Sequence, residues 1–139
     1  MTIEWKDSYL TGHKELDSDH QKLLLLLSTI KRQIDSDAPF ASLKESIDLL
    51  AKVTQEHFQR ESEVMSKLEG DTPLVKEHNQ EHKALFDEVG TLFEELKLAI
   101  LEKDKKIKCT EIFDKFEKWF AIGLRDDLRI KKLLNSPAK

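Results

Sequence analysis

Apolar residues recur at steps of three and four along four separate stretches of this chain. An α-helix completes a turn in 3.6 residues, so this spacing places the apolar side chains of each stretch on one helix face. No stretch alternates with a period of two, so a sheet is not expected. The first stripe consists of Leu16, His20, Leu23, Leu27, Ile30 and Ile34. The pattern predicts amphipathic helices that pack their apolar faces together.

The three later stripes have the same spacing. They comprise Leu43, Ile47, Leu50, Thr54, His57, Glu61, Val64 or Met65, and Leu68; then Val75, His78, His82, Leu85, Val89, Leu92, Leu96 and Ala99; then Ile112 or Phe113, Phe116, Phe120, Gly123, Asp127, Ile130 and Leu134. Gly70 signals the end of the second helix, and Thr72 with Pro73 signals the start of the third. We expect an extended arm and four helices, at 1–16, 17–36, 41–69, 73–102 and 109–134. Helices of this length with short links are typical of an all-α, up-down-up-down four-helix bundle.

Composition narrows the class of protein further. The 139 residues fit one domain over 1–139, and a net charge of −4 with both signs interspersed argues against a nucleic-acid partner. The longest apolar run, Leu23 to Leu27, is too short to span a membrane, and the N-terminus lacks the features of a signal peptide. The single cysteine, Cys109, fits a reducing compartment. We therefore expect a cytoplasmic protein.

Six polar residues fall on the apolar stripes, where a plain bundle would carry Leu or Ile. Burying a polar group without a partner costs roughly 2–7 kcal/mol, and an unpaired carboxylate costs more. Six such groups would together exceed the roughly 5–15 kcal/mol of net stability that a typical domain has. The six residues are His20, His57, Glu61, His78, His82 and Asp127. Some partner in the core must compensate for their burial.

The spacing of these residues indicates a metal ion as that partner. His57 and Glu61 are four residues apart, as are His78 and His82, so each pair projects from one face of its helix. The first and fourth helices each add one more polar residue of the set. Imidazoles and carboxylates that converge from four helices are how bundles hold di-iron or di-manganese centres. Iron suits this donor set, zinc is an alternative by affinity alone, and a hydrogen-bonded core without metal is the competing interpretation.

Several segments of the chain resemble the hemerythrin family, most closely the bacterial single-domain hemerythrins. Trp5 and the segment Tyr9-Leu10-Thr11-Gly12 resemble the family's N-terminal arm. Residues 16–23, with a histidine at position 20, resemble its first-helix motif. Residues 57–63 resemble its His-Phe-x-x-Glu-Glu motif, and residues 78–85 resemble its His-x-x-x-His motif. These motifs occur in the family's order and cover nearly the whole chain.

The resemblance implies a four-helix bundle around two non-haem irons. It implies that His20 and His57 hold one iron and that His78 and His82 hold the other. Glu61, an aspartate from the fourth helix and an oxo or hydroxo group would bridge the two ions. The implied activity is reversible binding of dioxygen for storage, delivery or sensing, without catalytic residues. Dioxygen or a similar small ligand is then the expected partner.

The fourth helix departs from the family pattern. The family has a tryptophan, a histidine four residues later and an aspartate five residues beyond that. Here Trp119 is followed by Gly123 at the histidine position and by Leu128 at the aspartate position. The stripe places Asp127 rather than Leu128 on the inward face, so we predict Asp127 as the bridging carboxylate. The competing interpretation is that Asp127 is a surface acid close to an arginine.

The missing histidine leaves the second iron short of one ligand. His13 could replace it, provided that residues 13–16 are not helical. A water molecule or an exogenous ligand could instead fill the space beside Gly123, or the second iron could bind weakly or not at all. An open iron position would also suit a redox enzyme, either peroxidase-like or handling nitric oxide. A bundle poor in metal would instead be an interaction module.

Overall fold

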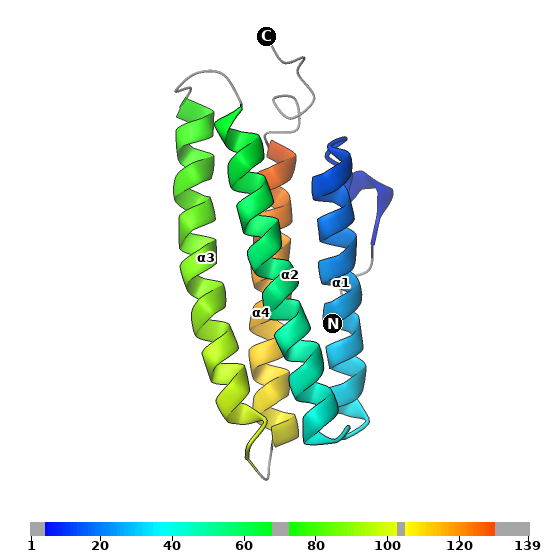
Figure 1. Ribbon diagram of the computed structural model, residues 1–139. Coiled ribbons are helices and arrows are strands. Elements are labelled where there is room, and N and C mark those ends of the chain that lie inside the picture. Colours follow the sequence, from blue (N-terminus) through cyan, green and yellow to red (C-terminus); the bar gives the residue numbers. More distant parts are fainter. Residues whose placement is uncertain (1–4, 68–72, 103–104, 130–139) are drawn as a thin grey trace.

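The computed structural model describes residues 5–67, 73–102 and 105–129, which form four long antiparallel helices (Figure 1). These elements are η1 (Asp7–Tyr9), a short 3-10 turn, followed by α1 (Lys14–Asp35), α2 (Phe40–Ser66), α3 (Pro73–Ala99) and α4 (Lys105–Arg129). α1 packs against α2 and α4, and α3 packs against the same two helices. The predicted all-α four-helix bundle is confirmed. Within the described residues, none of the helices combines the length and the apolarity needed to cross a membrane.

The helix ends differ from the predicted ones by up to four residues. α1 begins at Lys14 rather than at 17, because His13 caps it: Nδ1 of His13 accepts a hydrogen bond from the backbone N–H of Leu16 at 3.4 Å. α4 begins at Lys105 rather than at 109, α2 begins one residue earlier than predicted, and α3 begins at Pro73 as predicted. α1, α2 and α3 end one to three residues before the predicted positions. The predicted ends at 69 and 134 and the signals at Gly70 and Thr72 lie outside the described residues.

The N-terminal arm is fastened to α1 through Asp17. The carboxylate of Asp17 accepts hydrogen bonds from the backbone N–H of Thr11 at 2.8 Å, from the hydroxyl of Thr11 at 2.8 Å and from the backbone N–H of Gly12 at 3.1 Å. Gly12 has a φ of 86°, which residues with a Cβ rarely adopt, and this turn directs both amides toward Asp17. Trp5 and Tyr9 meet edge to face at 5.6 Å and pack against the apolar core. The arm therefore lies along α1 (Figure 1).

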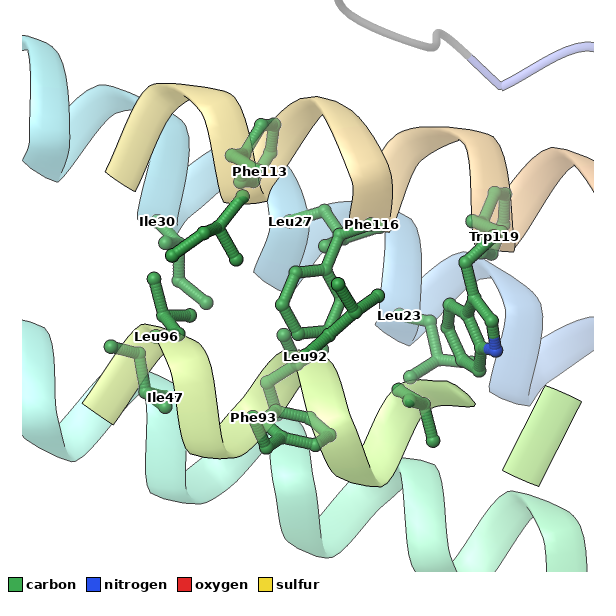
Figure 2. Packing of buried hydrophobic residues seen from close by; sticks show 14 of the residues in the cluster. Leu23, Leu27, Ile30, Ile47, Leu92, Phe93, Leu96, Phe113, Phe116 and Trp119 are labelled. Carbon is green, nitrogen blue, oxygen red and sulfur yellow. The ribbon is translucent and has the colours of Figure 1, made fainter. Parts of the chain in front are cut away.

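Apolar side chains fill the half of the bundle that contains the α1–α2 and α3–α4 connections. Figure 2 shows Ile30, Leu96, Ile47 and Phe113 on neighbouring helices, with Phe116 and Phe93 further along the bundle. The rings of Phe93 and Phe116 meet edge to face at 5.1 Å. Fully burying a large apolar side chain contributes roughly 1.5–3 kcal/mol. This half therefore supplies the packing that holds the four helices in register.

The antiparallel arrangement brings four distant segments together at the opposite end of the bundle. The start of α1, the end of α2, the start of α3 and the end of α4 all meet there, at the upper end in Figure 1. The six polar residues of the stripes occur in these segments, so chain topology alone gathers them at one end.

Candidate metal centre

Two buried carboxyl groups lie among the four histidines at this end of the bundle. Glu61, on α2, is 3% exposed. Its Oε2 lies 3.0 Å from Nε2 of His57, one helical turn earlier, and its Oε1 lies 3.0 Å from Nε2 of His78 on α3. The two oxygens of Glu61 therefore face imidazoles from two different helices.

The two oxygens of Asp127, on α4, likewise face imidazoles from two different helices. Its Oδ2 lies 2.8 Å from Nε2 of His20 on α1, and its Oδ1 lies 3.0 Å from Nε2 of His78. Asp127 is buried, whereas the neighbouring Leu128 is only partly buried. The structure thus places Asp127, rather than the residue at the family's aspartate position, among the histidines.

The ligand atoms form two groups that overlap at Asp127. One group contains His20 and His57 with Asp127, and the other contains Glu61 and His78 with Asp127; the atoms of each group lie within 4.8 Å of one another. Two ligands at about 2.1 Å from a common divalent ion, at right angles to each other, are about 3.0 Å apart. The nitrogen–oxygen distances of 2.8 to 3.0 Å match this separation and are also those of direct hydrogen bonds. The residues present therefore form two groups of nitrogen and oxygen ligands that fit metal cations.

His82 is the most loosely held member of the set. Its Nε2 lies 3.8 Å from Oε2 of Glu61, and its side chain is 16% exposed. This nitrogen is buried and has no hydrogen-bond partner among the described residues. Leaving a buried polar atom unsatisfied costs about 1–3 kcal/mol. A metal ion bound at Nε2 would remove that cost, which is a second indication that the centre suits a cation.

Hydrogen bonds inside the centre shift the pKa values of its histidines. Burial lowers the pKa of His57, but hydrogen bonds to Asp19 and Glu61 outweigh this effect and raise that pKa to about 10. Burial acts in the same direction on His78, and hydrogen bonds to both central carboxyl groups raise its pKa to about 10. The pKa of His82 is lowered, chiefly by burial. A metal ion that binds at His57 or His78 must therefore displace a firmly held proton.

One buried acid of this region, Asp19, was not among the predicted site residues. Its Oδ2 lies 3.1 Å from Nδ1 of His57 and 3.1 Å from Nε of Arg60. Asp19 precedes His20 directly and so lies about 100° away from the stripe of α1, and periodicity therefore gave no sign of its burial. The sequence did contain one signal for a buried acid, which is Arg60, directly before Glu61. A buried acid needs a cationic partner, and Arg60 is such a cation close to the predicted ligands.

A small cavity adjoins the two groups of ligands. Its volume is about 30 Å³, and its apolar wall consists of Leu23, Phe58, Leu85, Trp119, Phe120 and Leu124. A volume of about 10–15 Å³ is enough for one water molecule, so the cavity admits a molecule the size of water or dioxygen. The indole N–H of Trp119 donates to the backbone carbonyl of Leu85 at 2.9 Å, which fixes this part of the wall.

A wider groove on the surface between α2 and α3 meets the cavity at Phe58 and His82. The groove has a volume of about 380 Å³, and Phe86 and Lys83 also line it. The ring of Phe58 lies 4.5 Å from that of His82, 5.3 Å from that of Phe86 and 6.0 Å from that of Trp119. Phe58 and His82 line both spaces and therefore lie at the boundary between the groove and the cavity.

The structure also bears on the replacement for the missing fourth-helix histidine. Residues 14–16 are helical, so the condition for His13 to reach the centre fails. His13 caps α1 seven residues before His20, about 10 Å away along the helix axis. Gly123 lines the cavity, and a Cβ at this position would meet only Cδ1 of Leu85, at 3.6 Å. The space beside Gly123 is thus part of the cavity, and His13 does not fill it.

Comparison with known families supports this assignment of the centre. Residues 11–122 match the family model of the hemerythrin HHE cation-binding domain. The matched segment includes the five candidate ligands of α1, α2 and α3, and it ends just before Gly123 and Asp127. The chain matched no curated protein and no solved structure. Because the family model covers most of the chain, this protein belongs to the hemerythrin family of HHE cation-binding domains.

Proposed function

We propose that this chain is a non-haem di-iron protein that binds dioxygen reversibly, for storage, delivery or sensing. The observation that supports the proposal most is the position of the two carboxylates. Glu61 presents one oxygen to His57 and the other to His78, while Asp127 presents one to His20 and the other to His78. Carboxylates placed in this way can bridge two ions. Nitrogen and oxygen ligands without a thiolate suit iron.

The chain's own side chains would hold, neutralise and shield the ions. Bound iron would supply the redox-active centre at which dioxygen is taken up. His20 and His57 would bind one ion, and His78 and His82 the other. The two bridging carboxylates would offset positive charge in a region that water hardly reaches. The apolar wall of the cavity offers few hydrogen-bond partners to water, and this would limit the proton supply that turns uptake of oxygen into its reduction.

A redox enzyme is the second candidate, and Gly123 is the observation that favours it. The family's histidine position carries no ligand here, and the space beside it belongs to the cavity. An ion with an additional open position could react with peroxide or nitric oxide rather than hold dioxygen. A metal-poor interaction module is the third candidate, and the metal content of the protein distinguishes it from the other two.

The proposal extends to location and partners. We propose that the protein works in the cytoplasm, because a sequence with a single cysteine, Cys109, cannot form a disulfide within the chain and so requires no oxidising compartment. The proposed partner is dioxygen or a similar small ligand, with no nucleic acid and no membrane involved.

Iron content and the visible spectrum together test the proposed function. Protein produced with iron is expected to hold two irons per chain. Once reduced without air, it should develop a charge-transfer band on oxygenation and lose this band when oxygen is removed. A colourless protein with two irons would rule out the proposed oxygen binding. Sustained turnover of peroxide would favour the enzyme, and substoichiometric iron would favour the interaction module.

A further inference from the structure

His57 differs from two other histidines of the centre because its Nδ1 has a hydrogen-bond partner. Nδ1 of His57 lies 3.1 Å from Oδ2 of Asp19, whereas Nδ1 of His20 and of His78 has no hydrogen-bond partner among the described residues. A carboxylate only accepts hydrogen bonds, so Nδ1 of His57 carries the hydrogen and donates it. Nε2 is then the nitrogen that His57 presents to Glu61 and to the interior of the centre.

Asp19 is itself held in place from α2. Its Oδ2 also accepts a hydrogen bond from Nε of Arg60 at 3.1 Å. Arg60 follows His57 by three residues, so both side chains leave the same face of α2 and meet the same oxygen of Asp19. Asp19 is 4% exposed, while the side chain of Arg60 is 32% exposed. A partly exposed arginine thus compensates a buried acid, which in turn orients a histidine.

We propose that Asp19 is a positioning residue of the metal centre, which fixes the tautomer and the ring orientation of His57, and that Arg60 holds Asp19 in place. This inference rests on the proposed metal-binding function and adds a supporting pair to one half of the centre. A carboxylate behind a metal-binding imidazole orients the ring and makes it a better ligand, and losing such a partner typically costs about 10–100-fold in metal affinity.

The hydrogen bond from His57 to Asp19 belongs to one half of the centre, and this asymmetry makes the inference testable. Asp19 contacts His57 in the half that also contains His20, and no comparable carboxylate faces Nδ1 of His78 among the described residues. Removing the charge of Asp19 should therefore weaken the binding of one ion and leave the other unchanged. If Asp19 only stabilised the fold, its removal would instead weaken the binding of both ions or of neither.

The test is a titration of the full-length chain with Co²⁺, in competition with a chromophoric chelator. Asp19→Asn keeps the size of the side chain and removes its charge. Asp48→Asn is the matched control, because Asp48 is exposed on α2 and forms a surface ion pair with Lys44. The ¹⁵N chemical shifts of the His57 ring, recorded on the zinc-loaded protein, report its tautomer independently of affinity.

The proposal expects Asp19→Asn to bind one ion as the wild type does and the other about 10–100-fold more weakly, with altered ring shifts of His57. The control should bind both ions normally. Unchanged affinities in Asp19→Asn would overturn the proposal while leaving the proposed function intact. A wild-type chain that binds no metal would overturn the proposed function instead.

A second variant keeps the test decisive if Asp19→Asn does not fold. Arg60→Lys retains the positive charge but loses the rigid geometry of the guanidinium that meets Asp19. It should weaken the same binding step by a smaller factor and leave the other step unchanged. Equal affinities in Arg60→Lys and the wild type would also count against the proposal.

Discussion

Glu61 and Asp127 share one imidazole in the interior of the bundle, because Nε2 of His78 lies 3.0 Å from Oε1 of Glu61 and 3.0 Å from Oδ1 of Asp127. Burial raises the pKa of Asp127, and the negative charge of Glu61 raises it further. Burial acts in the same direction on Glu61, but hydrogen bonds from Asp127, His57 and His78 hold its pKa well below the usual range. The pair therefore keeps a proton at pH values where an exposed aspartate has lost it. Two bridged metal ions would take the place of that proton.

Metal affinity is predicted to rise with pH, with release of protons on binding. The pKa values of His57 and His78 are about 10, so both imidazoles carry a proton at neutral pH that a metal ion must displace. The raised pKa of Asp127 adds to this requirement. Chelator competition at several pH values between 6 and 9 measures the effect. An affinity that does not change over this range would contradict it.

The metal-free chain is predicted to lose stability as the pH rises toward 10. The ordinary pKa of a histidine is 6.5, whereas the pKa of His57 and of His78 is about 10 in the folded chain, so the folded chain binds more protons between these values. The free energy of unfolding therefore falls with rising pH. The contribution is complete below pH 6.5 and disappears as the pH passes 10. Urea unfolding in the presence of a chelator measures it, and the lowered pKa of His82 opposes the trend only below about 6.5.

Asp127→Asn is predicted to reduce the iron content to at most one per chain. The amide retains one oxygen but loses the charge and the second oxygen, and Asp127 belongs to both groups of ligands. Asp114→Asn makes the same chemical change at an exposed position of the same helix and should leave the iron content unchanged. Elemental analysis of the purified variants measures both. Two irons in Asp127→Asn would show that the fourth-helix carboxylate is not a bridge.

Gly123→Ala is predicted to raise stability and at the same time weaken the binding of small ligands. Replacing a helical glycine by alanine stabilises by about 1 kcal/mol, and the new Cβ would meet Cδ1 of Leu85 at an ordinary 3.6 Å. Gly90→Ala on α3 is the matched control, because a Cβ there meets nothing within 4 Å. The temperature of thermal unfolding should rise in both variants. Azide affinity of the iron-loaded protein should fall only in Gly123→Ala, and equal affinities would place the ligand elsewhere.

Phe58→Leu is predicted to accelerate the entry of small ligands. The ring of Phe58 lies at the boundary between the surface groove and the cavity, and leucine would leave part of that boundary open. Truncation of a buried phenylalanine to alanine costs about 3–5 kcal/mol, so the milder change to leucine keeps the bundle folded. Phe86→Leu alters the groove alone and serves as the control. Stopped-flow mixing with azide measures the association rate, and a rate that responds only to Phe86→Leu would exclude this route.

The fold follows from the sequence because each stripe has to be buried, and antiparallel helices with short links bury four stripes at once. The start of α1 was less predictable, since a histidine seldom caps a helix and His13 does so here. The inward position of Asp127 followed from the same periodicity. Asp19 was missed because its burial depends on Arg60 and His57 from another helix, a tertiary relationship that no local pattern contains. Which histidine each carboxylate oxygen faces likewise depends on the rotation of each helix about its own axis.

Ile30, Ile47 and Phe113 are buried in the half of the bundle that contains the α1–α2 connection, away from the histidines. Much of the packing that makes the chain fold therefore lies away from the residues that carry its chemistry, although the same apolar cluster continues to the wall of the cavity. A scaffold with this division tolerates the exchange of individual ligands, as the glycine at position 123 illustrates. It is for the same reason a suitable host for engineered centres, because a new ion or a new reaction can be introduced at one end without rebuilding the other.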